Sequence, residues 1–170
     1  RGECTKEFLV VQRFRNFLAA MGLDRSPEGC NALHLQTLSR CAFMLPYAEE
    51  VCRTLSRDHK LYLVTNAVAS VQRGRLAKSP IVPYITAAFI SEEAGAAKPD
   101  PAYFDYVFAH IDGITRENCL VIGDSISSDI RGANNYGLPC CWYNPGHTPR
   151  PDGLRIDYEI TNLRQLYDIV

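Results

Sequence analysis

Short apolar runs alternate with segments of helical spacing from Lys60 onward, and this alternation constrains the fold more than any other feature. Each run is four residues or so long, and a segment of helical periodicity separates it from the next. Buried parallel strands read as short continuous apolar runs, so the pattern predicts an α/β fold with a parallel sheet covered by helices on both faces. The predicted strands are 61–64, 87–90, 119–122, 140–143 and, more weakly, 158–160.

The residues before Pro46 show helical spacing only. Their apolar positions predict one helix over about 9–21, ended by Gly22, and a second over about 27–43. We therefore expect two parts, a helical unit at 1–45 and an α/β unit at 46–170.

Charge and hydropathy exclude several classes of protein. Lys plus Arg total 18 and Asp plus Glu total 19, so the net charge is −1 and gives no case for binding a nucleic acid or an anionic membrane. No apolar stretch approaches the roughly 20 residues that span a bilayer. The charged residues at 1–6 do not resemble a signal peptide, so we expect a cytoplasmic protein.

The cysteines are odd in number, irregularly spaced and without a Cys-x-x-Cys pair, which argues against zinc ribbons and thioredoxin-type sites. We expect reduced, buried thiols. The seven are Cys4, Cys30, Cys41, Cys52, Cys119, Cys140 and Cys141.

Ligands of open α/β sheets bind beyond the carboxyl ends of the strands, and polar residues follow two of the predicted strands there. Thr65 and Asn66 come directly after 61–64 and could donate hydrogen bonds to an oxyanion, or could simply cap the next helix. Asp124 and Asp129 follow 119–122, and such carboxylates suit Mg²⁺. Alternatively, Asp129 could favour a helix N-terminus that Ser127 caps.

A lysine lies in the loop before the predicted helix at 101–110. Pro99 and Pro101 should hold this loop extended and fix Lys98, whose ammonium could neutralise a phosphoryl group or a carboxylate nucleophile. Alternatively, Lys98 could be an ordinary surface lysine, with Asp100 capping the helix. Trp142 is expected in the core, because tryptophan side chains are usually buried.

The order Thr65, Lys98, Asp124, Asp129 resembles motifs two to four of the haloacid dehalogenase (HAD) superfamily, over a match from about Pro46 to the C-terminus. Several stretches also resemble its pyrimidine 5′-nucleotidase branch. The resemblance implies a HAD-like Rossmann-type sheet with a helical cap, part of which would be residues 1–45. It also implies Mg²⁺-dependent hydrolysis of small phosphomonoesters, such as nucleoside monophosphates, through an aspartyl-phosphate. The branch stretches are 64–66, 72 with 75–76, 90–95, 98–100, 123–125 with 129–130, and 141–145.

By this resemblance, each site residue has an expected role. Thr65, with Asn66 beside it, would hold the phosphoryl oxygen, and Lys98 would pair with the nucleophile and the phosphate. Asp124 would bind Mg²⁺ directly, and Asp129 would act through water or supporting hydrogen bonds.

The family's first motif, Asp-x-Asp-x-Thr, does not occur in the chain. That motif carries the nucleophile and lies on the central strand of the family's sheet. We therefore expect a further N-terminal segment to supply it, and we expect residues 1–170 alone to fold poorly because the strands ending at Asn66 and Asp124 would lack a partner. A second departure is Ala67, where the branch commonly has glycine.

Two alternatives remain at this stage. A haloacid dehalogenase shares the fold, the lysine and an aspartate nucleophile but needs no Mg²⁺, and the Gly123-Asp124 pair argues against it. A non-catalytic binding module is the other possibility. The sequence leaves the substrate and the oligomeric state open.

Overall fold

Every strand in residues 6–170, which the computed structural model describes, pairs in parallel with its neighbours. β1 (Leu61–Thr65) pairs with β2 (Ile85–Ile90). A second sheet has the order β3 (Val121–Gly123), β4 (Cys140–Tyr143), β5 (Tyr158–Ile160). The predicted α/β class with parallel strands is confirmed. The strand β3 begins two residues after the start of its apolar run, because its first paired residue is Val121, opposite Cys140.

The described strands form two parallel sheets. Within the described residues, β1 pairs only with β2, and β3 pairs only with β4. The facing edges of β1 and β3 therefore have no shared strand between them in this part of the chain. This agrees with the expectation that the strands ending at Asn66 and Asp124 lack a common partner.

Helices cover both faces of the second sheet, as the alternating side chains of β4 show. Cys140 and Trp142 pack in a cluster with residues of α6 (Pro101–Ala109) and α7 (Arg131–Tyr136). Cys141, between them, packs in a separate cluster with α3 (Ala48–Leu55) and η3 (Leu163–Asp168). Because successive side chains of a strand point to opposite faces, β4 is buried on both. The remaining elements of the body are α4 (Ala69–Leu76), η1 (Val82–Tyr84), α5 (Ser91–Ala94) and the π-helical turn η2 (Ile126–Ile130).

The described cysteines are free thiols, but only two of them are buried. Cys140 and Cys141 are inaccessible to solvent, and burial raises the pKa of Cys141 to about 11. The expectation of buried thiols is wrong for those that are partly exposed, because they lie at the edges of the packed clusters or on the projecting helices; Cys4 lies outside the described residues. The partly exposed thiols are Cys30, Cys41, Cys52 and Cys119.

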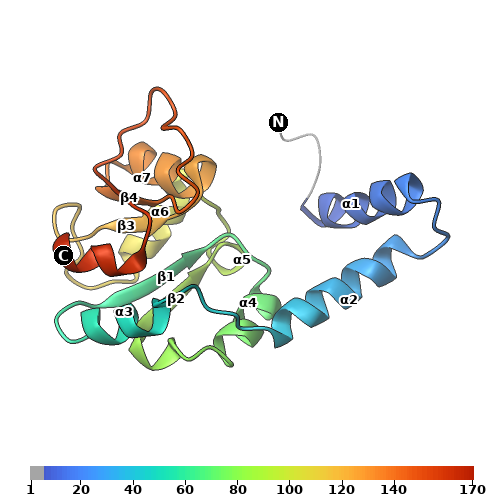
Figure 1. The fold of residues 1–170 in the computed structure, drawn as a ribbon, viewed down its shortest axis with the longest axis horizontal. Coiled ribbons are helices and arrows are strands. Elements are labelled where there is room, and N and C mark those ends of the chain that lie inside the picture. Colours follow the sequence, from blue (N-terminus) through green and yellow to red (C-terminus); the bar gives the residue numbers. More distant parts are fainter. Residues whose placement is uncertain (1–5) are drawn as a thin grey trace.

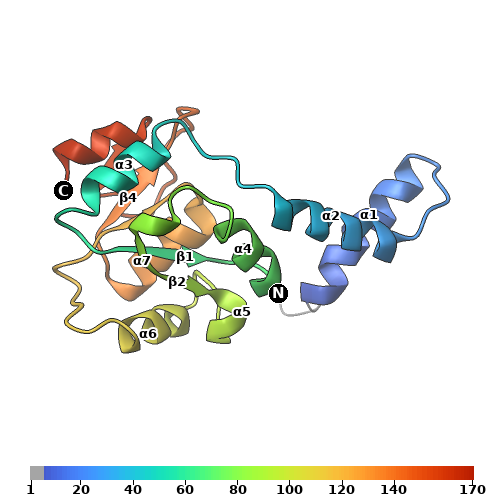
Figure 2. The same cartoon turned by 90° about the horizontal axis from the view of Figure 1, so that it is seen from below.

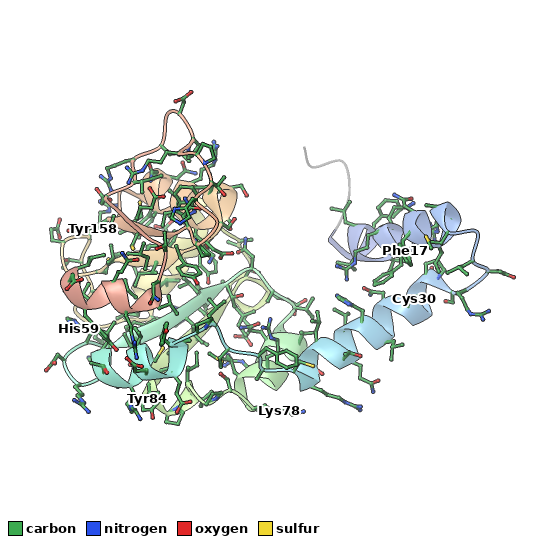
Figure 3. All side chains as sticks on the ribbon, viewed as in Figure 1. Phe17, Cys30, His59, Lys78, Tyr84 and Tyr158 are labelled. Carbon is green, nitrogen blue, oxygen red and sulfur yellow. The ribbon has the colours of Figure 1, made fainter. Side chains whose placement is uncertain are left out.

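α1 (Lys6–Ala20) and α2 (Pro27–Arg40) form a hairpin that projects from the α/β body (Figures 1 and 2). α2 ends before the predicted residue 43, because Cys41 is extended and the chain turns towards the body. The hairpin bears large exposed apolar side chains, and Figure 3 labels Phe17 among them. No helix in residues 6–170 is long and apolar enough to cross a bilayer. The exposed apolar side chains include Leu9, Phe17, Met21 and Leu33.

The hairpin rests on the body through a close approach of α2 to α4 at Gly74. A Cβ at Gly74 would lie 2.9 Å from the carbonyl oxygen of Ser39 on α2. Gly74→Ala should therefore loosen the hairpin, although alanine is favoured over glycine in a helix by about 1 kcal/mol. We expect faster amide hydrogen exchange in α2 for this variant.

A matched control exists on α2 itself. At Gly29 the nearest atom to an added Cβ is 3.4 Å away, which is an ordinary contact, so Gly29→Ala should slow exchange in α2 or leave it unchanged. Equal rates of amide hydrogen exchange in α2 for the two variants would contradict a close approach of α2 to α4 at Gly74.

Candidate functional site

The residues that the sequence analysis singled out line one cleft. Its volume is about 340 Å³, and it lies at the carboxyl ends of β1 and β3. Parallel strands place these ends at a common edge, which explains why residues distant in sequence meet there. The predicted residues in its lining are Thr65, Asn66, Lys98, Asp124 and Asp129.

Lys98 is buried and forms an ion pair, so the surface-lysine alternative is wrong. Only 7% of the residue is exposed, and its Nζ lies 2.7 Å from Oδ1 of Asp129. The same ammonium donates a hydrogen bond of 2.7 Å to the carbonyl oxygen of Val64 in β1. These two acceptors fix the ammonium between the two sheets, where it faces the cleft.

The loop before α6 is a turn, not the extended segment that its prolines predict. The Asp100 amide donates to the carbonyl of Ala97 at 2.9 Å, and the Lys98–Pro99 peptide bond is cis. Asp100 caps α6 through a hydrogen bond from the amide of Ala102, as expected.

The carboxamide of Asn66 holds the backbone of Lys98 from both sides. Its Nδ2 donates to the Lys98 carbonyl at 2.7 Å, and its Oδ1 accepts from the Lys98 amide at 2.9 Å. The Asn66 side chain is thus engaged with the loop, and it is placed to orient Lys98.

Asn66→Ala should remove this clamp and lower the free energy of unfolding by about 1–3 kcal/mol, since each hydrogen bond contributes about 1 kcal/mol. Urea unfolding measures the change. Asn162→Ala is a control that removes a side-chain cap far from the cleft, at η3. If Asn66→Ala weakened ligand binding at the cleft no more than Asn162→Ala at equal loss of stability, the clamp would have no role in the site.

Thr65 ends β1 with its hydroxyl available to a ligand. Its backbone amide donates to the hydroxyl of Tyr103 at 3.0 Å, and no hydrogen bond to its side chain occurs within residues 6–170. The residue preceding α4 is Val68, which makes no side-chain cap, so the capping alternative for Thr65 and Asn66 is wrong.

The loop after β3 folds around the carboxylate of Asp129. The Ser125 amide donates to Oδ2 of Asp129 at 3.1 Å, while Oδ1 accepts from Lys98. A Cβ at Gly123 would lie 2.5 Å from this carboxyl group, so only glycine fits there. Ser125, not Ser127, caps the following turn by accepting from the amide of Ser128, because the wider π-helical turn begins two residues earlier than a helix capped by Ser127 would.

Asp124 differs from Asp129 because its carboxylate is exposed in the cleft. No hydrogen bond to this carboxylate occurs within the described residues. Its backbone carbonyl accepts from the indole of Trp142 at 3.0 Å, which fixes the main chain while leaving the carboxylate free. Trp142 is buried in the core as expected.

The donor set can be tested against a magnesium ion. The described residues contain no group of three or more His, Cys, Asp or Glu that could hold a metal. Mg²⁺ nevertheless commonly takes only one or two carboxylates and completes its shell with waters and substrate phosphate oxygens. Asp124 fits this as a direct ligand, and Asp129, with both oxygens already bonded, fits a supporting position.

Sequence reasoning missed Tyr103, which lies beside the cleft on α6. Its hydroxyl accepts from the Thr65 amide and donates to the Phe89 carbonyl at 2.6 Å. The available signal was a tyrosine next to Phe104 on the apolar face of the predicted helix, because a buried phenol hydroxyl needs a partner.

The chain is similar to known hydrolases. Residues 95–166 match the family described as HAD-hydrolase-like. The chain is 33% identical to pyrimidine 5′-nucleotidase PynA of Streptococcus pneumoniae, covering 96% of this chain and 70% of that protein. It is 28% identical to pyrimidine 5′-nucleotidase YjjG of Escherichia coli, covering 99% and 74% respectively.

A solved structure is similar over nearly the whole chain. The crystal structure of HAD-hydrolase YfnB from Bacillus subtilis, bound to magnesium, superimposes with a TM-score of 0.94 at 33% identity. The match covers 99% of this chain and 74% of that one.

Proposed function

This chain belongs to the HAD superfamily of hydrolases, and on that premise we propose that it provides most of the active site of a Mg²⁺-dependent phosphomonoesterase. The proposed substrates are nucleoside monophosphates or similar small phosphates. The observation that carries this proposal is the meeting of Thr65, Lys98 and Asp124 in one cleft. A hydroxyl donor, a buried cation and an exposed carboxylate are the groups that phosphoryl transfer uses.

Each group has a separate task in this proposal. The Thr65 hydroxyl donates to a non-bridging phosphoryl oxygen, and the Lys98 ammonium offsets negative charge on that group and on the nucleophile. Asp124 would hold Mg²⁺, which, when bound, would neutralise charge that develops on the phosphoryl oxygens. Asp129 keeps the Lys98 ammonium and the Ser125 backbone in place through its two oxygens.

The nucleophile in this proposal is an aspartate on a further strand, supplied by the same polypeptide or by another chain. That strand would pair with the open edges of β1 and β3. Its carboxylate attacks phosphorus, the P–O bond to the substrate alcohol breaks, and the second aspartate of the same Asp-x-Asp-x-Thr motif, as general acid, gives the leaving oxygen its proton. Water then passes a proton to that aspartate and attacks the aspartyl-phosphate, which releases inorganic phosphate and the free nucleophilic carboxylate.

The α1–α2 hairpin would form part of a cap over the cleft, with the boundary near residue 45. Support comes from its projection beyond the body and from its exposed apolar side chains, which further helices could cover (Figure 3). Caps exclude water and contact the leaving group, so this unit would help to select the substrate. PynA and YjjG are nucleotidases, which favours a nucleoside as that leaving group.

The deciding experiment is phosphatase turnover with and without Mg²⁺, on residues 1–170 and on the natural full-length polypeptide. Pyrimidine and purine nucleoside monophosphates and p-nitrophenyl phosphate are the substrates, and 2-chloropropionate tests for a dehalogenase. We expect Mg²⁺-dependent phosphate release from the full-length polypeptide only. Metal-independent chloride release would show a dehalogenase instead of a phosphatase. A folded but inactive full-length protein would support a non-catalytic binding module.

A further inference from the structure

Tyr103 is a fully buried polar side chain that lies between the two strands of the first sheet. Its exposed fraction is 0%, and both hydrogen-bonding functions of its hydroxyl are used. The oxygen accepts from the amide of Thr65 at 3.0 Å, and the O–H donates to the carbonyl of Phe89 at 2.6 Å. Tyr103 therefore ties the carboxyl end of β1 to the carboxyl end of β2.

The same side chain also contacts the buried cation of the cleft. Nζ of Lys98 lies 6.0 Å from the centroid of the Tyr103 ring, at the distance of a weak cation–π interaction. Lys98 is bonded in turn to the carbonyl of Val64, which immediately precedes Thr65. One tyrosine thus contacts the backbone of Thr65 and the ammonium of Lys98.

The hydroxyl is not needed to fill space. Phenylalanine has the same ring, and burying a hydroxyl is costly unless hydrogen bonds compensate for it. Burial raises the pKa of Tyr103 to about 12, so the hydroxyl stays protonated at neutral pH and can always donate to Phe89. The Tyr103 hydroxyl therefore acts by hydrogen-bonding the backbone at the ends of β1 and β2.

We propose that Tyr103 is a positioning residue of the phosphate site, which fixes Thr65 through its hydroxyl and supports Lys98 through its ring. This inference rests on the proposed phosphatase function. Without the hydroxyl, the Thr65 amide and the Phe89 carbonyl lose the partner that they share, although Thr65 stays opposite Ile90 in the ladder, and the Thr65 side chain no longer has a single position. Transition-state contacts depend on such positions to within fractions of an ångström.

The test compares Tyr103→Phe with Tyr106→Phe in the full-length protein. Tyr106 lies on the same helix, and its ring also packs against Phe89, with centroids 6.2 Å apart, so this control removes a hydroxyl without touching β1. We expect kcat of Tyr103→Phe to fall by about 10-fold with KM changed by less than about threefold, because the effect concerns orientation. The control should retain kcat within about twofold.

The outcomes separate this proposal from the proposed function. A lower melting temperature for Tyr103→Phe with kcat equal to that of Tyr106→Phe would overturn the positioning role and leave the phosphatase intact. A parent protein that neither turns over phosphomonoesters nor binds inorganic phosphate would overturn both. Should Tyr103→Phe fail to fold, the parent gives a second measurement: the Tyr103 ring resonances should shift together with the Thr65 amide resonance when inorganic phosphate binds. A Tyr103 ring that does not respond while the Thr65 amide does would contradict the proposal and leave the phosphate site intact.

Discussion

Replacing Lys98 with methionine should lower the free energy of unfolding by about 3–5 kcal/mol, the usual cost of removing one partner from a buried ion pair. The pair qualifies because the side chains of Lys98 and Asp129 are 5% and 12% exposed. Methionine retains the length of the side chain but leaves the Asp129 carboxylate buried, with the Ser125 amide as its one remaining donor among residues 6–170. The Val64 carbonyl loses its donor as well. Urea unfolding followed by circular dichroism measures the loss.

The same variant should lose at least about 100-fold in turnover, because the fixed cation of the proposed phosphate site is gone. The double variant Lys98→Met/Asp129→Asn separates the two effects. It should regain at least about 1 kcal/mol of stability relative to Lys98→Met, since the unpaired charge is removed, yet remain inactive. Lys78→Met, at an exposed lysine labelled in Figure 3, should change stability by less than about 0.5 kcal/mol. A double variant as unstable as the single one would contradict a buried ion pair.

The sequence could predict the edge of the sheet at which the site lies. Thr65 and Asp124 follow apolar runs, and the geometry of parallel strands brings such positions together without knowledge of any side-chain contact. The strand boundaries of β4, at Cys140–Tyr143, follow from the same apolar pattern. These features depend on local hydropathy, which the sequence states directly.

The contacts that hold the site in place could not be predicted in the same way. The Asn66–Lys98 clamp joins residues 32 apart, and the Thr65–Tyr103 bond joins residues 38 apart. Both depend on how the loop before α6 turns, and the prolines alone predicted an extended loop. The choice of Ser125 over Ser127 as the cap likewise depends on a π-helical turn that local propensity does not distinguish from an ordinary helix.

The carboxylates at 124 and 129 read alike in sequence, but the structure gives them different surroundings, and substitutions should separate their roles. Asp124→Asn should leave stability within about 0.5 kcal/mol of the parent, because this carboxylate is exposed and accepts no hydrogen bond from the described residues. In contrast, Asp129→Asn disturbs the ion pair with Lys98 and should be clearly destabilising.

Magnesium binding should reverse this order of effects. Removing a direct ligand lowers metal affinity more than removing a supporting group does. Removing a supporting group lowers it by about 10–100-fold. We therefore expect Asp124→Asn to weaken Mg²⁺ binding to the full-length protein by more than about 100-fold and to abolish turnover, at nearly unchanged stability. Isothermal titration with Mg²⁺, alongside turnover and urea unfolding, gives all three quantities. If Asp124→Asn bound Mg²⁺ as the parent does, Asp124 would not be the metal ligand, and the proposed phosphatase would need another carboxylate in that place.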